Sequence, residues 1–125
     1  MNTLLLVFLG GGIGSLARYG VGRWIGTPPL GSFPWATFAV NVVGSLLIGA
    51  LVGLALQRGI SDATRAFLAF GVLGGFTTYS SFNAETLVLF EQRGALAAGG
   101  YVLATVAVCL VAGWCGGWIA RGALG

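Results

Sequence analysis

The sequence predicts an all-α integral membrane protein in which four helices cross the bilayer and the third is broken at mid-membrane. Two observations carry this prediction. Charged residues make up 7% of the 125 residues, against about 25% in soluble domains, and hydrophobic residues reach 57%. A soluble protein cannot cover its surface with so few charges. The chain also contains four apolar runs, each near the length of about 20 residues that a helix needs to cross a bilayer.

Short connectors rich in turn residues separate the four runs. The expected spans are 4–25, 35–56, 66–90 and 96–120. The first connector holds all three prolines, and little sequence is left for a soluble domain. We therefore expect residues 1–125 to form one transmembrane domain. An even number of spans places both termini on the same side of the membrane.

The positive side chains give only a weak orientation signal. Every basic residue is Arg. The side that holds the termini and the second connector has Arg58, Arg65 and Arg121, whereas the other side has Arg23 and Arg93. Orientation follows from such counts near the span ends, and here they differ by one. Insertion in both orientations and a single fixed orientation therefore both remain open.

Small residues recur every four positions in three of the runs, which places them on one helix face. The stripes are Gly10, Gly14, Arg18, Gly22 and Gly26; Thr37, Asn41, Ser45, Gly49 and Gly53; and Tyr101, Thr105, Cys109, Gly113 and Gly117. Small residues at this spacing let membrane helices approach closely, so packing is the expected role of the glycines. Asn41 is different, because a buried amide has to be hydrogen-bonded or face water. Cys109 and Cys115 are expected to be small packing residues without a disulfide.

The third run interrupts the helical pattern near its middle. Gly71, Gly74 and Gly75 precede a stretch rich in hydroxyl and aromatic residues at 76–83. Adjacent glycines weaken a helix, and broken membrane helices expose backbone groups that bind ions. Carbonyls suit a cation such as sodium, whereas N–H groups and hydroxyls suit an anion. The alternative is a continuous helix in which the hydroxyls bond back to the preceding turn.

The charged residues inside the runs include Arg18, toward the end of the first, and Glu85, near the end of the third. Both ends face the same side, so the two side chains could pair and relieve the cost of burying each charge. An unpaired Arg18 would instead make a vestibule more positive and attract anions. The chain has no His, so Ser80 and Ser81 lack a partner for nucleophilic catalysis, and we expect no enzyme.

Four helices are few for enclosing a polar path, so we expect a homo-oligomer, most simply a twofold dimer. If the two copies insert in opposite orientations, their broken spans can meet on the twofold axis. A nucleic-acid partner is not expected of a chain with this composition.

Three segments carry a resemblance to a known family. They are 10–19 (GGGIGSLARY), 37–45 (TFAVNVVGS) and 74–82 (GGFTTYSSF), the last followed by Ala84-Glu85-Thr86. The chain resembles the Fluc family of fluoride channels, also called CrcB proteins, over nearly its whole length. The resemblance implies an antiparallel, dual-topology homodimer with two fluoride pores and a central structural sodium ion. It also implies a multi-pass protein of a bacterial inner or plasma membrane that passively exports fluoride from the cytoplasm.

The resemblance also implies a role for each matching position. Gly74 and Thr77 match backbone carbonyls that hold sodium, Asn41 matches a pore-lining asparagine, and Tyr79 and Phe82 match two aromatic residues whose ring edges face fluoride. The implied polar track on the fourth helix is Tyr101, Thr105 and Cys109, with Thr37 and Ser81 as further pathway candidates. Two positions depart from the family pattern: Tyr79 stands where Phe is usual, and Cys109 replaces a hydroxyl residue with a weaker donor.

Two other functions stay open on the residues alone. A small dual-topology, proton-coupled multidrug transporter also has four spans, but it needs an acidic residue in the first span, and none is present. A non-conducting membrane assembly subunit is the other alternative. The buried Asn41 and the interrupted third run argue against it.

Overall fold

The computed structural model describes residues 2–124, and every regular element in this part of the chain is helical. The elements are α1 (Thr3–Ile25), α2 (Trp35–Arg58), α3 (Asp62–Thr64), the π-helix η1 (Arg65–Leu73), α4 (Gly74–Phe76), α5 (Tyr79–Arg93) and α6 (Ala95–Leu124). Three helices of the described part are long and apolar enough to cross a bilayer: Thr3–Ile25, Trp35–Arg58 and Ala95–Gly122. The protein is therefore an integral, multi-pass membrane protein, as predicted.

The third apolar run differs from its expected span. In place of one helix over 66–90, it forms a first half from Asp62 to Phe76 and a second half, α5, from Tyr79 to Arg93. The nine residues of η1 are π-helical, a feature that the sequence did not predict. Long π-helices are rare and often occur at functional sites. The expected break is confirmed, and it follows α4.

Glycines in a left-handed conformation end three of the helices. Gly26 follows α1, Gly59 follows α2 and Gly94 follows α5, with φ angles of 89°, 71° and 88°. Each donates its N–H to the carbonyl four residues earlier, which closes the last turn. The helices consequently end within a few residues of the predicted bounds. The third span begins four residues early, at Asp62, and α6 continues four residues beyond its predicted end, to Leu124.

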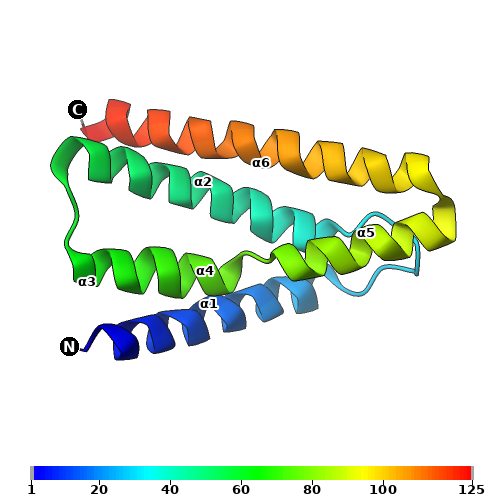
Figure 1. The fold of residues 1–125 in the computed structure, drawn as a ribbon, viewed down its shortest axis with the longest axis horizontal. Helices are drawn as coiled ribbons and strands as arrows, with labels where there is room; N and C mark the ends of the chain where they lie inside the picture. Colours follow the sequence, from blue (N-terminus) through cyan, green and yellow to red (C-terminus); the bar gives the residue numbers. More distant parts are fainter. Residues whose placement is uncertain (1, 125) are drawn as a thin grey trace.

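The helices form two packed groups (Figure 1). In one group α2 and α6 lie side by side over most of their length, and in the other α1 lies against η1 and α4. The helix α5 leaves the second group and runs beside the first part of α6. Both described ends of the chain lie at the same end of the bundle as the α2–α3 connector. The break between α4 and α5 lies near the middle of the long axis of the bundle (Figure 1).

Glycines set the distance between the paired helices. A Cβ atom built on Gly49 or Gly116 would collide with the carbonyl of Gly113 or Leu46, respectively. On the other pair, a Cβ on Gly14 would collide with the Val72 carbonyl, and one on Gly10 would lie 2.5 Å from the Phe67 carbonyl oxygen. The predicted packing role is confirmed for Gly10 and Gly14 of the first stripe and for Gly49 of the second. A Cβ on Gly22 or Gly26 would meet no atom within 4 Å, and Gly116 lies outside the stripe predicted for the fourth helix.

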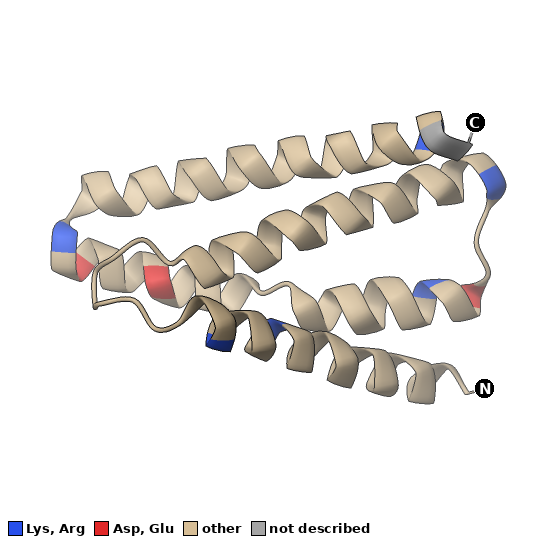
Figure 2. Ribbon diagram, turned by 180° about the vertical axis from the view of Figure 1, so that it is seen from behind, with Lys and Arg blue, Asp and Glu red and all other residues tan. Residues whose placement is uncertain are grey.

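The outer surface of the bundle is apolar over its middle. Leu110, Ile13 and Leu47, near the middle of α6, α1 and α2, are 70%, 52% and 47% exposed. The basic and acidic residues lie mainly toward the two ends (Figure 2). This distribution fits a lipid-facing surface, because exposed large apolar side chains in such number would aggregate in water.

Candidate functional site

The backbone leaves the helical conformation at two threonines. Thr77 has φ −80° and ψ 157°, and Thr78 has φ −149° and ψ 121°, so both are extended. The Thr78 side chain then begins α5, because its hydroxyl accepts the Ser81 N–H at 3.2 Å. Two successive extended residues remove the helical hydrogen bonds at this point, and other groups have to replace them.

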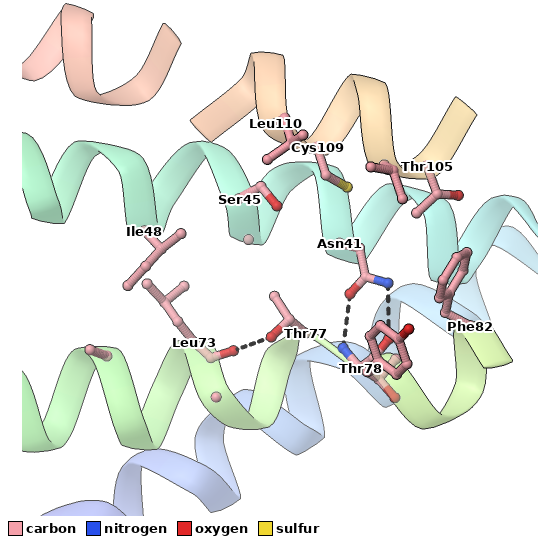
Figure 3. Close-up of a pocket in the computed structure, with 15 residues that line it drawn as sticks. Asn41, Ser45, Ile48, Leu73, Thr77, Thr78, Phe82, Thr105, Cys109 and Leu110 are labelled. Atoms are coloured by element: carbon pink, nitrogen blue, oxygen red, sulfur yellow. Dashed lines mark hydrogen bonds between the residues drawn. The ribbon is translucent and has the colours of Figure 1, made fainter. Parts of the chain in front are cut away.

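Asn41 of α2 replaces the bonds that Thr78 has lost (Figure 3). The Asn41 Nδ2 donates to the Thr78 carbonyl at 3.0 Å, and the Thr78 N–H donates to Asn41 Oδ1 at 2.8 Å. The amide side chain thus pairs with the backbone of Thr78 as a neighbouring strand would. The sequence predicted that Asn41 needs a polar partner, and the partner is the backbone of the break.

Because the Thr78 and Ser81 N–H groups bond elsewhere, the carbonyls of Gly74 and Thr77 lose their usual helical donors. In a continuous helix the Thr78 N–H would donate to Gly74 and the Ser81 N–H to Thr77. Here they donate to Asn41 Oδ1 and to the Thr78 hydroxyl. The Thr77 hydroxyl bonds back to the Leu73 carbonyl at 2.9 Å, so the back-bonding of the alternative prediction also occurs, but on a broken helix.

Arg18 of α1 holds the break from the opposite side. Its Nε donates to the Gly75 carbonyl at 3.1 Å, which would otherwise accept from the Tyr79 N–H. The close approach is possible because Gly75 has no side chain: a Cβ there would lie 2.5 Å from the Gly11 carbonyl oxygen. The broken segment is thus fixed by one polar side chain from each neighbouring helix.

Glu85 does not pair with Arg18, so that expectation is wrong. The Glu85 carboxylate accepts the Thr37 hydroxyl at 2.7 Å and the Tyr101 hydroxyl at 3.0 Å. Both donors are buried, with exposed fractions of 7% and 1%. Two hydroxyl donors, one from α2 and one from α6, therefore stabilise the acid of α5 inside the bundle.

Aromatic rings surround this cluster. Phe82 packs on Tyr101 with ring centroids 5.2 Å apart, and Tyr79 meets Phe82 edge-on at 5.5 Å. Phe82 is buried, whereas Tyr79 is 80% exposed. Phe33 also meets Tyr101 edge-on at 5.3 Å. Sequence analysis missed Phe33, which is partly buried, because it lies in the proline-rich connector, where no helical periodicity marks the residues that pack inward.

Among the cavities of the described part of the chain, three are lined by residues of the predicted site. The basic cavity, of about 540 Å³, is lined by residues that include Arg18, Arg23, Thr37, Thr78 and Ser81. The central cavity, of about 420 Å³, is lined by residues that include Asn41, Ser45, Thr78, Thr105 and Cys109. The glycine groove, of about 740 Å³, is lined by residues that include Ser45, Gly49, Cys109, Gly113 and Arg121. Thr78 joins the first cavity to the second, and Ser45 and Cys109 join the second to the third.

Most of the predicted site residues meet in these cavities. The lining of the central cavity includes Asn41, Gly74, Thr77, Tyr79, Phe82, Thr105 and Cys109, and that of the basic cavity includes Arg18, Thr37 and Ser81. Tyr101 and Glu85 are not in the lining of either cavity, and the Tyr101 hydroxyl donates a hydrogen bond to the Glu85 carboxylate. Ser45 and Thr78 were not predicted as pathway residues, although the four-residue stripe through Asn41 contains Ser45.

The Thr105 hydroxyl is the least satisfied polar group of the site. Thr105 is only 6% exposed, and its Oγ1 has no hydrogen-bond partner among the described residues. It stands one turn from Cys109, which is a free thiol, on the α6 side of the central cavity (Figure 3). A buried hydroxyl without a partner costs free energy unless water or an ion bonds to it.

Comparison with known proteins gives a consistent family. Residues 5–117 match a family described as CrcB-like protein, camphor resistance (CrcB). A protein of Anaeromyxobacter sp. (strain K) is 51% identical over 113 residues, which cover 90% of each chain. A protein of Thermus thermophilus is 53% identical over 91 residues (73% of this chain, 72% of the relative), and one of Chelativorans sp. (strain BNC1) is 46% identical over 129 residues (99% and 100%). All three are named fluoride-specific ion channel FluC. From this match over most of its length, the chain belongs to the CrcB-like family.

Proposed function

We propose that this protein is a passive, fluoride-selective ion channel that lets fluoride leave the cytoplasm. The carrying observation is the broken third span, whose backbone is held by Asn41 and Arg18 between the basic and central cavities. The choice of fluoride as the transported ion is supported by the names of the relatives. The proposal makes the protein a channel and not an enzyme, in agreement with those names.

The chemistry of the walls suits a small, strongly hydrated anion. Arg18 and Arg23 in the basic cavity draw anions from water. Further along, the hydroxyls of Ser45 and Thr105 and the positive ring edge of Phe82 supply donors that replace the water shell of the ion. The acid in this region, Glu85, already accepts two hydroxyl hydrogen bonds, which disperses its charge.

The working unit of the proposal is an antiparallel homodimer with two pores. Gly74 and Tyr79 line the central cavity and are exposed in the single chain, so one wall of the cavity is left for another molecule to supply. The near-equal numbers of Arg at the two ends permit insertion in both orientations. A second, inverted copy would bring its own break to the same depth and would complete both pathways.

A sodium ion fits the same dimer as a structural ion. The Gly74 and Thr77 carbonyls have lost their usual helical donors, and backbone carbonyls at a helix break are ligands that suit sodium. Two copies would supply twice as many carbonyls. When bound, the ion would add fixed positive charge near the pathway.

Ion efflux from liposomes tests the proposed function. Vesicles that contain the purified protein are loaded with potassium fluoride, and external fluoride is followed with an electrode after valinomycin is added. The proposal predicts fluoride release that depends on valinomycin, and no chloride release from matched vesicles that are loaded with potassium chloride. Release coupled to protons and to cationic drugs would favour the transporter. No release from folded protein would favour the assembly subunit.

A further inference from the structure

We propose that the Cys109 thiol is a covalent control point of the pathway: a small thiol-reactive electrophile that caps it blocks ion flux. This inference rests on the proposed function, and it concerns a residue that departs from the family pattern. Cys109 is half-buried and forms no disulfide. Its position in the cavities, and not its presence alone, carries the proposal.

Cys109 stands where two cavities join. The residues that line both the central cavity and the glycine groove are Ser45, Ile48, Cys109 and Leu110. Ser45 and Ile48 come from α2, and Cys109 and Leu110 come from α6, so the junction is a neck between two packed helices (Figure 3). Atoms added to the sulfur extend into this neck or into the two cavities that it joins, because interiors of packed helices leave few other voids.

A second observation indicates that a polar species enters the central cavity. Thr105 lies one turn before Cys109 on the same helix and is only 6% exposed, and its hydroxyl has no hydrogen-bond partner among the described residues. The nearby Tyr101 hydroxyl donates a hydrogen bond to Glu85. An unpaired hydroxyl in a cavity with other polar walls is satisfied by water or by an anion. A water-soluble reagent can follow the same route to the sulfur.

The reaction with methyl methanethiosulfonate is fully defined. The Cys109 sulfur, as thiolate, attacks the methylthio sulfur of the reagent, and a new S–S bond forms. The S–S bond of the thiosulfonate breaks, and methanesulfinate leaves with the electron pair. The thiol proton passes to buffer. Dithiothreitol reverses the modification by thiol–disulfide exchange and is itself oxidised.

Cys115 provides a matched control within the same helix. It is exposed and lines a small pocket with Val111, Trp114 and Trp118, of which Val111 and Trp114 also line the glycine groove. Among the described residues, Cys115 is not in the lining of the basic cavity, the central cavity or the glycine groove. Modification there adds atoms on the outer face of α6 and leaves the neck open.

The test compares flux before and after treatment in each variant. Liposomes with the unmodified sequence, Cys109→Ser or Cys115→Ser are treated with methyl methanethiosulfonate, fluoride efflux is measured, and the modified cysteine is located by peptide mass spectrometry. We expect flux to fall by at least about tenfold in the unmodified sequence and in Cys115→Ser, because the methylthio group overfills the neck. Dithiothreitol restores the flux. The treated-to-untreated ratio of Cys109→Ser stays near one.

Three results would overturn the inference: Cys109 unmodified after treatment, Cys109 modified with flux unchanged, or a block that persists in Cys109→Ser. Failure of the proposed function looks different, since untreated protein would then release no fluoride. In that case peptide mass spectrometry still shows whether the dissolved reagent reaches Cys109. An unmodified thiol would again contradict a route from water to the sulfur.

Discussion

At the scale of single residues, the Asn41 side chain stands in for a peptide group. It donates to the Thr78 carbonyl and accepts from the Thr78 N–H, so one amide satisfies both backbone groups of an extended residue. An Asp side chain has nearly the same shape but cannot donate when ionised. The hydrogen bond that the Asn41 Nδ2 donates to the Thr78 carbonyl is therefore the interaction that an Asp side chain cannot make.

The substitution Asn41→Asp should lower fluoride flux by at least about tenfold, equivalent to about 1.4 kcal/mol. The carboxylate loses the bond to the Thr78 carbonyl, faces that oxygen across a short distance and repels an approaching anion. Electrode-detected efflux from liposomes measures the effect. Asn83→Asp is the matched control, because Asn83 is exposed on α5. Full flux in folded Asn41→Asp would remove Asn41 from the pathway.

The substitution Tyr101→Phe should destabilise the fold by about 1–3 kcal/mol, because the Glu85 carboxylate loses one of its two buried donors. Thermal unfolding in detergent provides the measurement. Tyr19→Phe removes the same hydroxyl from a residue that is 66% exposed and should leave the unfolding temperature unchanged. Equal unfolding temperatures for both variants would show that the Tyr101 hydrogen bond contributes nothing.

Residue-level predictions from the sequence succeeded where the chemistry of one side chain decides the outcome. A membrane amide has to find partners, and Asn41 does. The pairing of Arg18 with Glu85 failed because position along a span gives depth in the membrane but not the direction in which a side chain points. Arg18 faces the break, whereas Glu85 faces α2 and α6.

At the scale of elements, glycine contacts fix how closely the helices pack. A Cβ on Gly49 would meet the carbonyl of Gly113, which belongs to the backbone of α6 and cannot move aside alone. The α2–α6 pair forms one wall of both the central cavity and the glycine groove. Separation of these helices would therefore change the pathway together with the stability.

The substitution Gly49→Ala should destabilise the protein by about 1–3 kcal/mol through overpacking. Gly100→Ala is the control, because a Cβ on Gly100 meets no atom within 4 Å and alanine favours the helix. Size-exclusion profiles and thermal unfolding in detergent report both variants. Comparable stability of the two proteins would mean that the close contact of α2 and α6 is dispensable.

Helix boundaries were predictable from the apolar runs and the turn residues, and the break was predictable from the paired glycines and hydroxyls. The length and type of the segments at the break were not. Nothing in the sequence of residues 65–73 predicts π-helical bonding, since the apolar pattern fits an ordinary helix. The break depends on Arg18 of α1, which bonds Gly75, and on Asn41 of α2, which bonds Thr78, and both partners are distant in sequence.

At the scale of the whole molecule, the distribution of Arg decides how the chain inserts. Arg58, Arg65 and Arg121 belong to the end that holds the termini, and Arg23 and Arg93 belong to the other. Basic residues near span ends favour the cytoplasmic side. Because the numbers of Arg at the two ends differ by only one, the proposed antiparallel dimer predicts that a single Arg substitution changes the proportion of chains in each orientation.

A reporter fused to the C-terminus should reveal both orientations in the unmodified chain. Arg93→Gln should move the population toward a cytoplasmic C-terminus, and Arg121→Gln should move it the opposite way. Paired fusions to a cytoplasm-active fluorescent protein and a periplasm-active phosphatase measure the two populations. A single orientation that neither substitution shifts would contradict dual topology and the dimer built on it.

The central claim is that the broken span lies on a passive path for fluoride, and the reversal potential of the current tests it most directly. Purified protein is fused into a planar bilayer with different fluoride concentrations on the two sides and equal chloride. The account predicts a current that reverses at the equilibrium potential of fluoride and that Asn41→Asp diminishes. A reversal potential set by chloride, protons or sodium would contradict it.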